Sequence, residues 1–148
     1  MGFSQGTYGC SLVNNTVRAN YNEGILLFYR RTKILMMNNN ISRNASNSGI
    51  IGSESSFYDY NVGTSNLVNG KPIYLLKNET SLLINQAIPE MGYLALVGCK
   101  NVTVEDLTFK NNFNCLTLVN TESSNIHRNT IEHNLIGIEI INSSKERF

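Results

Sequence analysis

The chain has 148 residues, a formal net charge of +1 and only 16% charged side chains. This length suffices for one domain, and the near-neutral balance gives no electrostatic argument for binding nucleic acid or an anionic membrane surface. No stretch approaches the roughly 18 consecutive apolar residues of a membrane-spanning helix. The first residues lack the basic and apolar regions of a signal peptide.

Short apolar segments recur along the chain at intervals of about two dozen residues. Their first inward residues form the series Ile25, Ile50, Ile73, Leu94, Leu116 and Ile138. Within a segment the apolar residues alternate, as Leu116 and Leu118 do, which is the pattern of a strand with one buried face. No segment is long enough for a helix. A strand-based repeat of this length predicts a solenoid.

Each repeat contains three strand-like pieces separated by polar corners, as in residues 24–44 and 115–134. A three-sided coil cannot bury its inner face alone, whereas stacked coils with parallel strands enclose a continuous apolar interior. We therefore predict an all-β, right-handed parallel β-helix of about six coils, forming a single domain over residues 1–148. The second-side positions are expected at Ile34, Leu83, Val102 and Ile126, and the third-side positions at Val17, Ile41, Leu67, Ile88, Leu107 and Ile131.

Asparagine occurs 23 times, far above ordinary usage. Asn20, Asn44 and Asn134 each follow a third-side residue by three positions. Asparagine tolerates the left-handed backbone of tight bends, and stacked asparagine side chains can hydrogen-bond to one another. We expect these residues to form the corners of the coils and a ladder that joins one coil to the next.

Residues 53–72 interrupt the repeat with turn-forming residues and aromatics. The segment Pro72–Leu75 then returns to the register of the other strands. This pattern favours an irregular loop that projects from one coil over a boundary between two domains.

Two longer segments resemble a known family. They are Val-Asn-Gly-Lys-Pro-Ile-Tyr-Leu-Leu-Lys-Asn (68–78) and Gly-Tyr-Leu-Ala-Leu-Val-Gly-Cys-Lys-Asn-Val-Thr-Val-Glu-Asp-Leu (92–107). Both resemble the NosD-like parallel β-helix repeat proteins of the pectin-lyase-like superfamily. The resemblance implies an extracellular or periplasmic location and a role in supplying copper to nitrous oxide reductase. The wider group includes carbohydrate-binding and sugar-cleaving surface proteins.

The chain departs from this family plan because it shows neither an export signal nor an end cap. Bare ends of a β-helix expose unpaired edges, which natural solenoids cover. We expect a fragment of a longer helix, with flanking domains or a stacking protein partner.

Sugar cleavage on this scaffold needs paired carboxylates, or acids that hold Ca²⁺, on one outer face. The outward residues of the first side are expected to be Leu26, Ile51, Tyr74, Ala95, Thr117 and Glu139. No outer row carries two acids on adjacent coils, and Glu105 and Asp106, as neighbours in a strand, should point to opposite faces. We assign no catalytic residue and expect that the protein is not an enzyme.

Copper would require thioether, thiolate or imidazole ligands that gather in space. The candidates are Met36, Met37, Cys99, Cys115, His127 and His133. Met36 lies two positions after inward Ile34 and is expected in the core, whereas His127 should face solvent. The three cysteines, which include Cys10, form no CxxC pair and are expected to act as small buried hydrophobes. We assign no metal site and no cofactor.

Carbohydrate recognition would use aromatic rings beside amide groups. The candidate platform consists of Tyr58, Tyr60, Tyr74 and Tyr93. The alternative is that these rings shield the irregular loop against the barrel. The sequence favours a non-catalytic β-helix repeat module of a surface or envelope protein, which binds a polysaccharide or surface glycan or serves as a scaffold. A NosD-like copper-delivery protein and a degenerate polysaccharide lyase or hydrolase are the alternatives.

Overall fold

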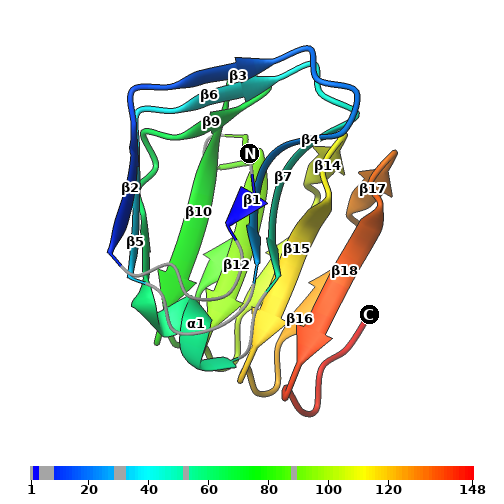
Figure 1. Ribbon diagram of the computed structural model, residues 1–148. Coiled ribbons are helices and arrows are strands. Elements are labelled where there is room, and N and C mark those ends of the chain that lie inside the picture. Colours follow the sequence, from blue (N-terminus) through cyan, green and yellow to red (C-terminus); the bar gives the residue numbers. More distant parts are fainter. Residues whose placement is uncertain (1, 4–8, 29–32, 52–53, 88–89) are drawn as a thin grey trace.

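The computed structural model describes residues 2–3, 9–28, 33–51, 54–87 and 90–148. Within these ranges the chain forms a parallel β-solenoid of about five turns. Its strands are grouped in two stacks, which are joined near residue 70 (Figure 1). No helix in the described residues is long and apolar enough to cross a membrane.

The N-terminal stack consists of three parallel sheets, in the orders β1-β4-β7, β2-β5-β8 and β3-β6-β9. Its strands are β1 (Gly2–Phe3), β2 (Cys10–Val13), β3 (Thr16–Arg18), β4 (Glu23–Phe28), β5 (Ile34–Met37), β6 (Asn40–Ser42), β7 (Ser46–Ile51), β8 (Tyr60–Val62) and β9 (Leu67–Val68). A short helix, α1 (Glu54–Asp59), lies between β7 and β8.

The C-terminal stack follows the same three-sided plan, with the sheets β10-β12-β15-β18, β11-β13-β16 and β14-β17. Its strands are β10 (Lys71–Lys77), β11 (Leu83–Ile84), β12 (Tyr93–Val97), β13 (Thr103–Glu105), β14 (Thr108–Lys110), β15 (Asn114–Val119), β16 (Asn125–His127), β17 (Thr130–Glu132) and β18 (Ile136–Ile141). The strand pairs within this stack are parallel.

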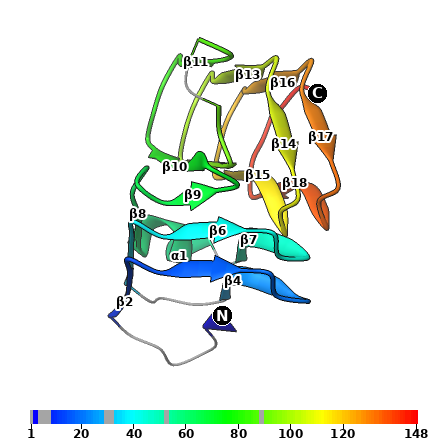
Figure 2. The same cartoon turned by 90° about the horizontal axis from the view of Figure 1, so that it is seen from above.

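The two stacks meet at an antiparallel hairpin, in which Val68 lies opposite Lys71. Its turn consists of Asn69 (φ 51°) and Gly70 (φ 80°), and such left-handed pairs suit the tight turn of a two-residue hairpin. Because the hairpin reverses the chain, the C-terminal stack grows across the end of the N-terminal stack (Figure 2).

Strand β12 is buried on both faces, since each of its five residues is fully buried. Tyr93, Ala95 and Val97 pack in one apolar cluster with the interior of the N-terminal stack. Leu94 and Leu96 pack in a second cluster, which fills the C-terminal stack. One sheet thus contributes side chains to both hydrophobic cores, and its outer face covers the end of the N-terminal stack.

This arrangement corrects the expected register of the first side. Instead of one continuous stack, the six strands fall into two sheets, β1-β4-β7 and β10-β12-β15-β18. Ile50 lies opposite Leu27 rather than Ile25, and Leu94 lies opposite Tyr74 rather than Ile73. The expected match from Leu94 through Leu116 to Ile138 is confirmed.

The prediction of which first-side residues face outward is also partly wrong. Ala95 and Thr117 are fully buried, because the face that they share is covered by the N-terminal stack. Leu26 is likewise buried, and Tyr74 packs against the interior of the C-terminal stack.

On the second and third sides, some inward residues lie one or two positions away from those that were expected. Ile84 is the inward residue of β11, whereas Leu83 is 51% exposed. On the third side Phe109, not Leu107, lies opposite Ile131.

In the N-terminal stack, Val17 lies opposite Ile41 as expected, and Val68 takes the next position rather than Leu67. The expected third-side residue Ile88 lies outside the described residues. The irregular segment 53–72 is more regular than predicted, because Tyr60 continues the β2-β5-β8 sheet opposite Ile34.

The corners have a two-residue pattern, in which a left-handed residue precedes a ladder residue. Ala19, Arg43 and His133 take the left-handed backbone (φ 54–57°). Each directly precedes one of the asparagines that were expected to take this conformation, namely Asn20, Asn44 and Asn134. Asparagine is nevertheless common at left-handed positions: Asn14, Asn38, Asn69, Asn78, Asn101, Asn111, Asn120 and Asn142.

The asparagine ladder is confirmed. Asn15 donates its backbone N–H and its amide Nδ2 to Asn39 Oδ1 at 3.1 and 2.9 Å. Asn39 in turn donates both groups to Asn66 Oδ1 at 3.2 and 2.7 Å. A second ladder joins Asn20, Asn44 and Asn47. These buried amides satisfy backbone groups that the corners leave unpaired.

Candidate functional site

The four tyrosines of the predicted platform do not share a surface. Tyr60 and Tyr93 are completely buried, and Tyr74 is partly buried in the interior of the C-terminal stack. Tyr93 donates its hydroxyl to Thr117 Oγ1 at 3.0 Å, and burial raises the pKa of its phenol. Tyr58 is the member of the four that remains exposed, with 40% of its surface accessible.

Tyr58 lines a hollow on the outer face of the sheet β2-β5-β8. Ser11, Leu35 and Asn61 lie opposite one another in adjacent strands and form one of its walls. Tyr58 and Asp59, at the end of α1, form another. The space measures about 440 Å³, and we call it the Tyr58 hollow.

The backbone around Tyr58 is held in place by Lys77. Lys77 Nζ donates to the backbone oxygens of Tyr58 and Tyr60 at 2.9 and 2.7 Å, which fixes the end of α1. Burial lowers the pKa of Lys77, and the Asp59 carboxylate partly offsets this shift. The Tyr58 hydroxyl lies against Gly98, where a Cβ atom would collide with it.

The chemistry of the Tyr58 hollow combines one aromatic face with hydroxyl, amide, carboxylate and ammonium groups. Besides Tyr58, the polar members are Ser11, Lys33, Asp59 and Asn61. Such a mixture suits a ligand with an apolar face and several hydroxyl groups. Sequence reasoning missed Ser11 and Asn61, although their alternation with buried Leu12 and Tyr60 would have placed them outside.

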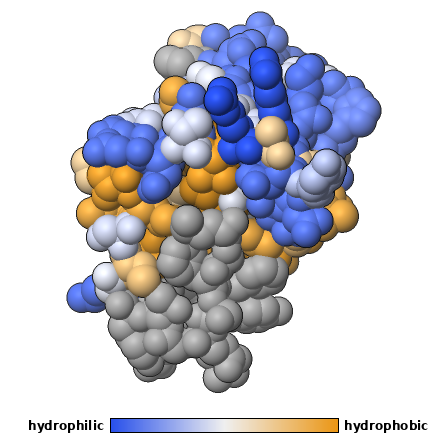
Figure 3. All heavy atoms as spheres, turned by 45° about the horizontal axis from the view of Figure 1, so that its top comes forward, coloured by the Kyte–Doolittle hydropathy of each residue, from blue (hydrophilic) through white to orange (hydrophobic). Residues whose placement is uncertain are grey.

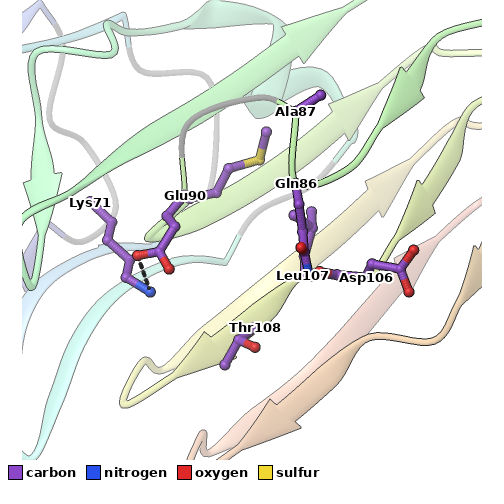
Figure 4. A pocket seen from close by; sticks show the side chains of 8 residues that line it. Lys71, Gln86, Ala87, Glu90, Asp106, Leu107 and Thr108 are labelled. Atoms are coloured by element: carbon purple, nitrogen blue, oxygen red, sulfur yellow. Dashed lines mark hydrogen bonds and ion pairs between the residues drawn. The ribbon is translucent and has the colours of Figure 1, made fainter.

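A second hollow, of about 560 Å³, lies on the C-terminal stack, beside β14 and the first residue of β10 (Figure 4). Lys71 and Glu90 form an ion pair of 2.9 Å on one side of it. Gln86 and Asp106 lie on the other side, with Gln86 Nε2 donating to the backbone oxygen of Asp106 at 2.8 Å, and Thr108 of β14 lies between the two groups. No aromatic residue lines this hollow among the described residues.

Three acidic residues of the outer face, Glu105, Asp106 and Glu122, are paired with cations from neighbouring coils. Arg128 contacts Asp106 at 2.9 Å and Glu105 at 2.8 Å, so the two carboxylates converge rather than point to opposite faces as expected. The cause is the left-handed backbone of Asp106 (φ 57°), which bends the chain out of the strand. The hydrogen bond from Arg128 lowers the pKa of the Asp106 carboxyl.

A further ion-pair ladder joins Lys100, Glu122 and Lys145, with distances of 3.0 and 2.8 Å. The hydrogen bonds from the two lysines lower the pKa of the Glu122 carboxyl. Hydrophilic residues cover much of the upper part of the face in Figure 3, whereas apolar residues gather lower on it. The Asp106 and Glu122 carboxyls, whose pKa values are lowered, are unsuited to act as general acids.

The candidate copper ligands are spread over several elements. Met36 is buried in the core as expected, Met37 is 43% exposed, and His133 is exposed at a corner. His127 is partly exposed on the outer face, where its Nε2 lies 3.1 Å from Glu105. Among the described residues, no group of three or more His, Cys, Asp or Glu side chains could hold a metal ion.

Two of the three cysteines are buried, namely Cys99 and Cys115, while Cys10 is half-buried. All three are free thiols. Burial raises the pKa of Cys115 to about 12 and also raises that of Cys99. Both buried thiols therefore stay protonated and behave as small hydrophobes, as the sequence suggested.

The stacked parallel strands, the left-handed corners and the asparagine ladders define a parallel β-helix repeat protein. The family model of right-handed β-helix regions matches residues 3–148, and the chain belongs to this family. That match covers the general β-helix repeat and does not single out the NosD-like proteins. No curated protein and no solved structure matches the chain.

Proposed function

We propose that the chain is a non-catalytic β-helix repeat module that binds a saccharide in the Tyr58 hollow. The observation that carries the proposal is Tyr58, which is 40% exposed and, with Asp59 and Asn61, lines a space of about 440 Å³. The ring offers an apolar platform, and the neighbouring carboxylate and amide can accept and donate hydrogen bonds to sugar hydroxyls.

Three acids of the outer face are held by cations, since Glu105, Asp106 and Glu122 each contact a cation of an adjacent coil. The hydrogen bonds from these cations lower the pKa of the Asp106 and Glu122 carboxyls, which are therefore poor proton donors to a leaving group. A location at the cell surface or in the periplasm remains an expectation from the family resemblance.

A glycan array probed with the whole chain tests the proposal. We expect binding to one or more neutral or weakly acidic oligosaccharides, and a loss of at least about tenfold in affinity for Tyr58→Ala, because truncation removes the aromatic platform. Tyr21→Ala is the matched control, since Tyr21 is 99% exposed and does not line the Tyr58 hollow. Equal binding by the two variants would disprove the role of Tyr58.

A structural scaffold is the second candidate function. It is favoured by the Lys100–Glu122–Lys145 ladder and the asparagine ladders, which reinforce stacking without using a ligand site. A folded chain that binds no saccharide on the array would support this role. Copper delivery and degenerate sugar cleavage stay predictions from the family resemblance, and a competition titration with Cu(I) tests the first.

A further inference from the structure

Strand β18 forms the edge of the first-side sheet of the C-terminal stack. It pairs with β15, and no strand of the described residues pairs with its other edge (Figure 1). The chain that follows β18 does not return to this edge. Residues 142–148 are all described, and they run to the second side, where Arg147 pairs with Asn125 of β16.

The side chains of this edge are apolar and accessible. Ile140 lies opposite Leu118 of β15, and it is 46% exposed whereas Leu118 is fully buried. All residues of β15 are buried because that strand has a neighbour on each edge, while the residues of β18 are half-buried or exposed. Proteins often protect such an edge with lysine or proline, and β18 contains neither. The strand is therefore suited to pair with a further strand.

The backbone of β18 presents hydrogen-bonding groups to the open edge. The N–H of Ile136 donates to the backbone oxygen of Phe113 at 2.6 Å, so the groups of Ile136 point toward β15. In a parallel pair alternate residues bond to the neighbouring strand. The N–H groups of Gly137 and Glu139 therefore point away from β15. The Gly137 carbonyl accepts the Cys115 thiol at 2.8 Å, and a carbonyl oxygen has a second lone pair for another donor.

The sequence of β18 is complementary to itself. When two copies of the strand pair antiparallel with Ile138 opposite Ile138, Ile136 lies opposite Ile140 and Gly137 lies opposite Glu139. The three isoleucines are on the side of the sheet that faces the core of the C-terminal stack, so the apolar interior continues from one copy to the next. Gly137 and Glu139 then form the hydrogen-bonded pairs, and the two Glu139 carboxylates avoid the directly opposite position that destabilises like charges.

The charges that flank β18 match under the same twofold axis. Glu132 lies four residues before β18 (Ile136–Ile141), and Lys145 lies four residues after it. In an antiparallel pair the start of one strand adjoins the end of the other, so Glu132 of each copy adjoins Lys145 of the second copy. Within one chain Glu132 lies 3.8 Å from Lys110, and Lys145 lies 2.8 Å from Glu122. Pairing would join these two rows with alternating charge.

We propose that two copies of the chain associate through antiparallel pairing of β18 with β18, which joins their first-side sheets into one continuous sheet. A second copy is favoured over another partner because both the strand and its flanking charges complement themselves, as a twofold interface requires. Addition of a strand to an open sheet edge is a recurrent mode of association. No residue of β18 lines the Tyr58 hollow, so the proposal is independent of saccharide binding.

Analytical ultracentrifugation of the whole chain over a range of concentrations tests the proposal. We expect a reversible equilibrium between monomer and dimer. Ile140→Lys should weaken the dimer at least about tenfold, because it places a charge on the apolar face of the paired strands. Val13→Lys is the matched control, since Val13 is 41% exposed on β2 of the N-terminal stack, and this variant should dimerise like the parent. Circular dichroism spectra that match the parent confirm that both variants fold.

An exchange of charges tests the antiparallel arrangement without altering β18. Glu132→Lys and Lys145→Glu should each weaken the dimer about two- to fivefold, which is the range of an exposed ion pair. The double variant should return to within about twofold of the parent, because the opposite charges meet again across the axis. Arg18→Glu, in the edge strand β3 of the N-terminal stack, is the control and should leave the dimer unchanged. Additive losses in the double variant would refute this arrangement.

Hydrogen exchange followed by nuclear magnetic resonance locates the interface. The Glu139 amide should be protected in the dimer and should exchange at least about tenfold faster after dilution to the monomer. A chain that stays monomeric at every concentration, or a Glu139 amide whose exchange is independent of concentration, would overturn the proposal. A series of larger species that Arg18→Glu abolishes would also overturn it, and would indicate head-to-tail stacking instead.

Discussion

Asn114 is one of the side chains that hydrogen-bond the two stacks to each other. Its Oδ1 accepts the N–H of Ile50 at 3.1 Å and its Nδ2 donates to the Ile50 carbonyl at 2.8 Å, so it substitutes for a backbone strand partner of β7. The same Nδ2 lies 2.7 Å from Glu139 Oε2. Burial raises the pKa of the Glu139 carboxyl, and the hydrogen bond from Asn114 opposes part of that rise. Tyr93 lies on the face of the sheet that meets the N-terminal stack, and burial keeps its phenol protonated.

The raised pKa of Glu139 predicts a pH dependence of stability. A carboxyl whose pKa is higher in the folded than in the unfolded state binds more protons when folded, so the free energy of unfolding falls as the pH rises above the ordinary value of 4.5. Glu139→Gln keeps an acceptor for Asn114 without the charge. We expect a melting temperature about 1–3 °C higher than that of the parent at pH 7, and no gain at pH 4.

Circular dichroism at pH 4–7 measures this effect. Glu132→Gln is the control, because Glu132 is exposed on the outer face and its lysine partner is 3.8 Å away. Its melting temperature should stay within about 1 °C of the parent at each pH. A lower melting temperature for Glu139→Gln at pH 7 would show that the carboxylate stabilises the junction.

At the scale of elements, the coils are held together by buried amides as well as by apolar side chains. Asn39 is 1% exposed, and besides its ladder bonds it donates Nδ2 to the Leu12 carbonyl at 2.8 Å. Its removal would leave the backbone N–H of Asn15 and the carbonyl of Leu12 without these partners. Buried polar groups that lose their partners pay the full cost of desolvation.

Asn39→Ala should therefore lower the free energy of unfolding by about 2–4 kcal/mol, since at least two backbone groups become unpaired. Urea denaturation followed by circular dichroism measures the change. Asn40→Ala is the neighbouring control: Asn40 is exposed, and its substitution should alter the free energy of unfolding by less than about 0.5 kcal/mol. If both variants unfold at the same urea concentration, the ladder does not stabilise the stack.

The elements differ in how far their sequence predicts them. Alternation identified β15, and the asparagine spacing identified the ladders, because both patterns arise from contacts within one turn or with the next. The same reasoning failed for the outward faces of β12 and β15, because every residue of both strands is buried, including Thr117, which was expected to face outward. Tyr74 was assigned to the surface because Ile73 was taken as the inward residue, whereas Tyr74 is the residue opposite inward Leu94. Tyr93 was assigned to the surface because a lone solenoid would leave its face open. The stack that covers Tyr93 is a long-range contact, and nothing local to this residue encodes it.

At the scale of the whole molecule, the junction depends on close approach of backbones. Gly92 lies where β12 meets the hairpin, and a Cβ atom there would come within 2.7 Å of both the Lys71 carbonyl oxygen and Val68 Cβ. The backbone N–H of Gly92 also donates to the Pro72 carbonyl at 2.8 Å, which fixes its position. Only glycine fits this contact without a shift of one stack against the other.

Gly92→Ala should lower the free energy of unfolding by about 1–3 kcal/mol, the usual cost of forcing extra volume into a packed site. Gly63→Ala is the matched control, because its added Cβ would meet nothing closer than Ser65 Oγ at 3.7 Å. The control should be neutral or slightly stabilising, since alanine restricts the unfolded chain. Urea denaturation compares the two variants. An unchanged midpoint for Gly92→Ala would mean that the junction accommodates the added methyl group without a loss of stability.

The hairpin at residues 67–72 also affects the order in which the chain is expected to fold. Its strands β9 and β10 join residues three to five positions apart, whereas stacked strands elsewhere join residues about two dozen positions apart. Closing the short loop costs less chain entropy, and isolated hairpins form within microseconds. Folding is therefore expected to start in the middle of the chain, with the hairpin as a template from which turns are added toward both ends.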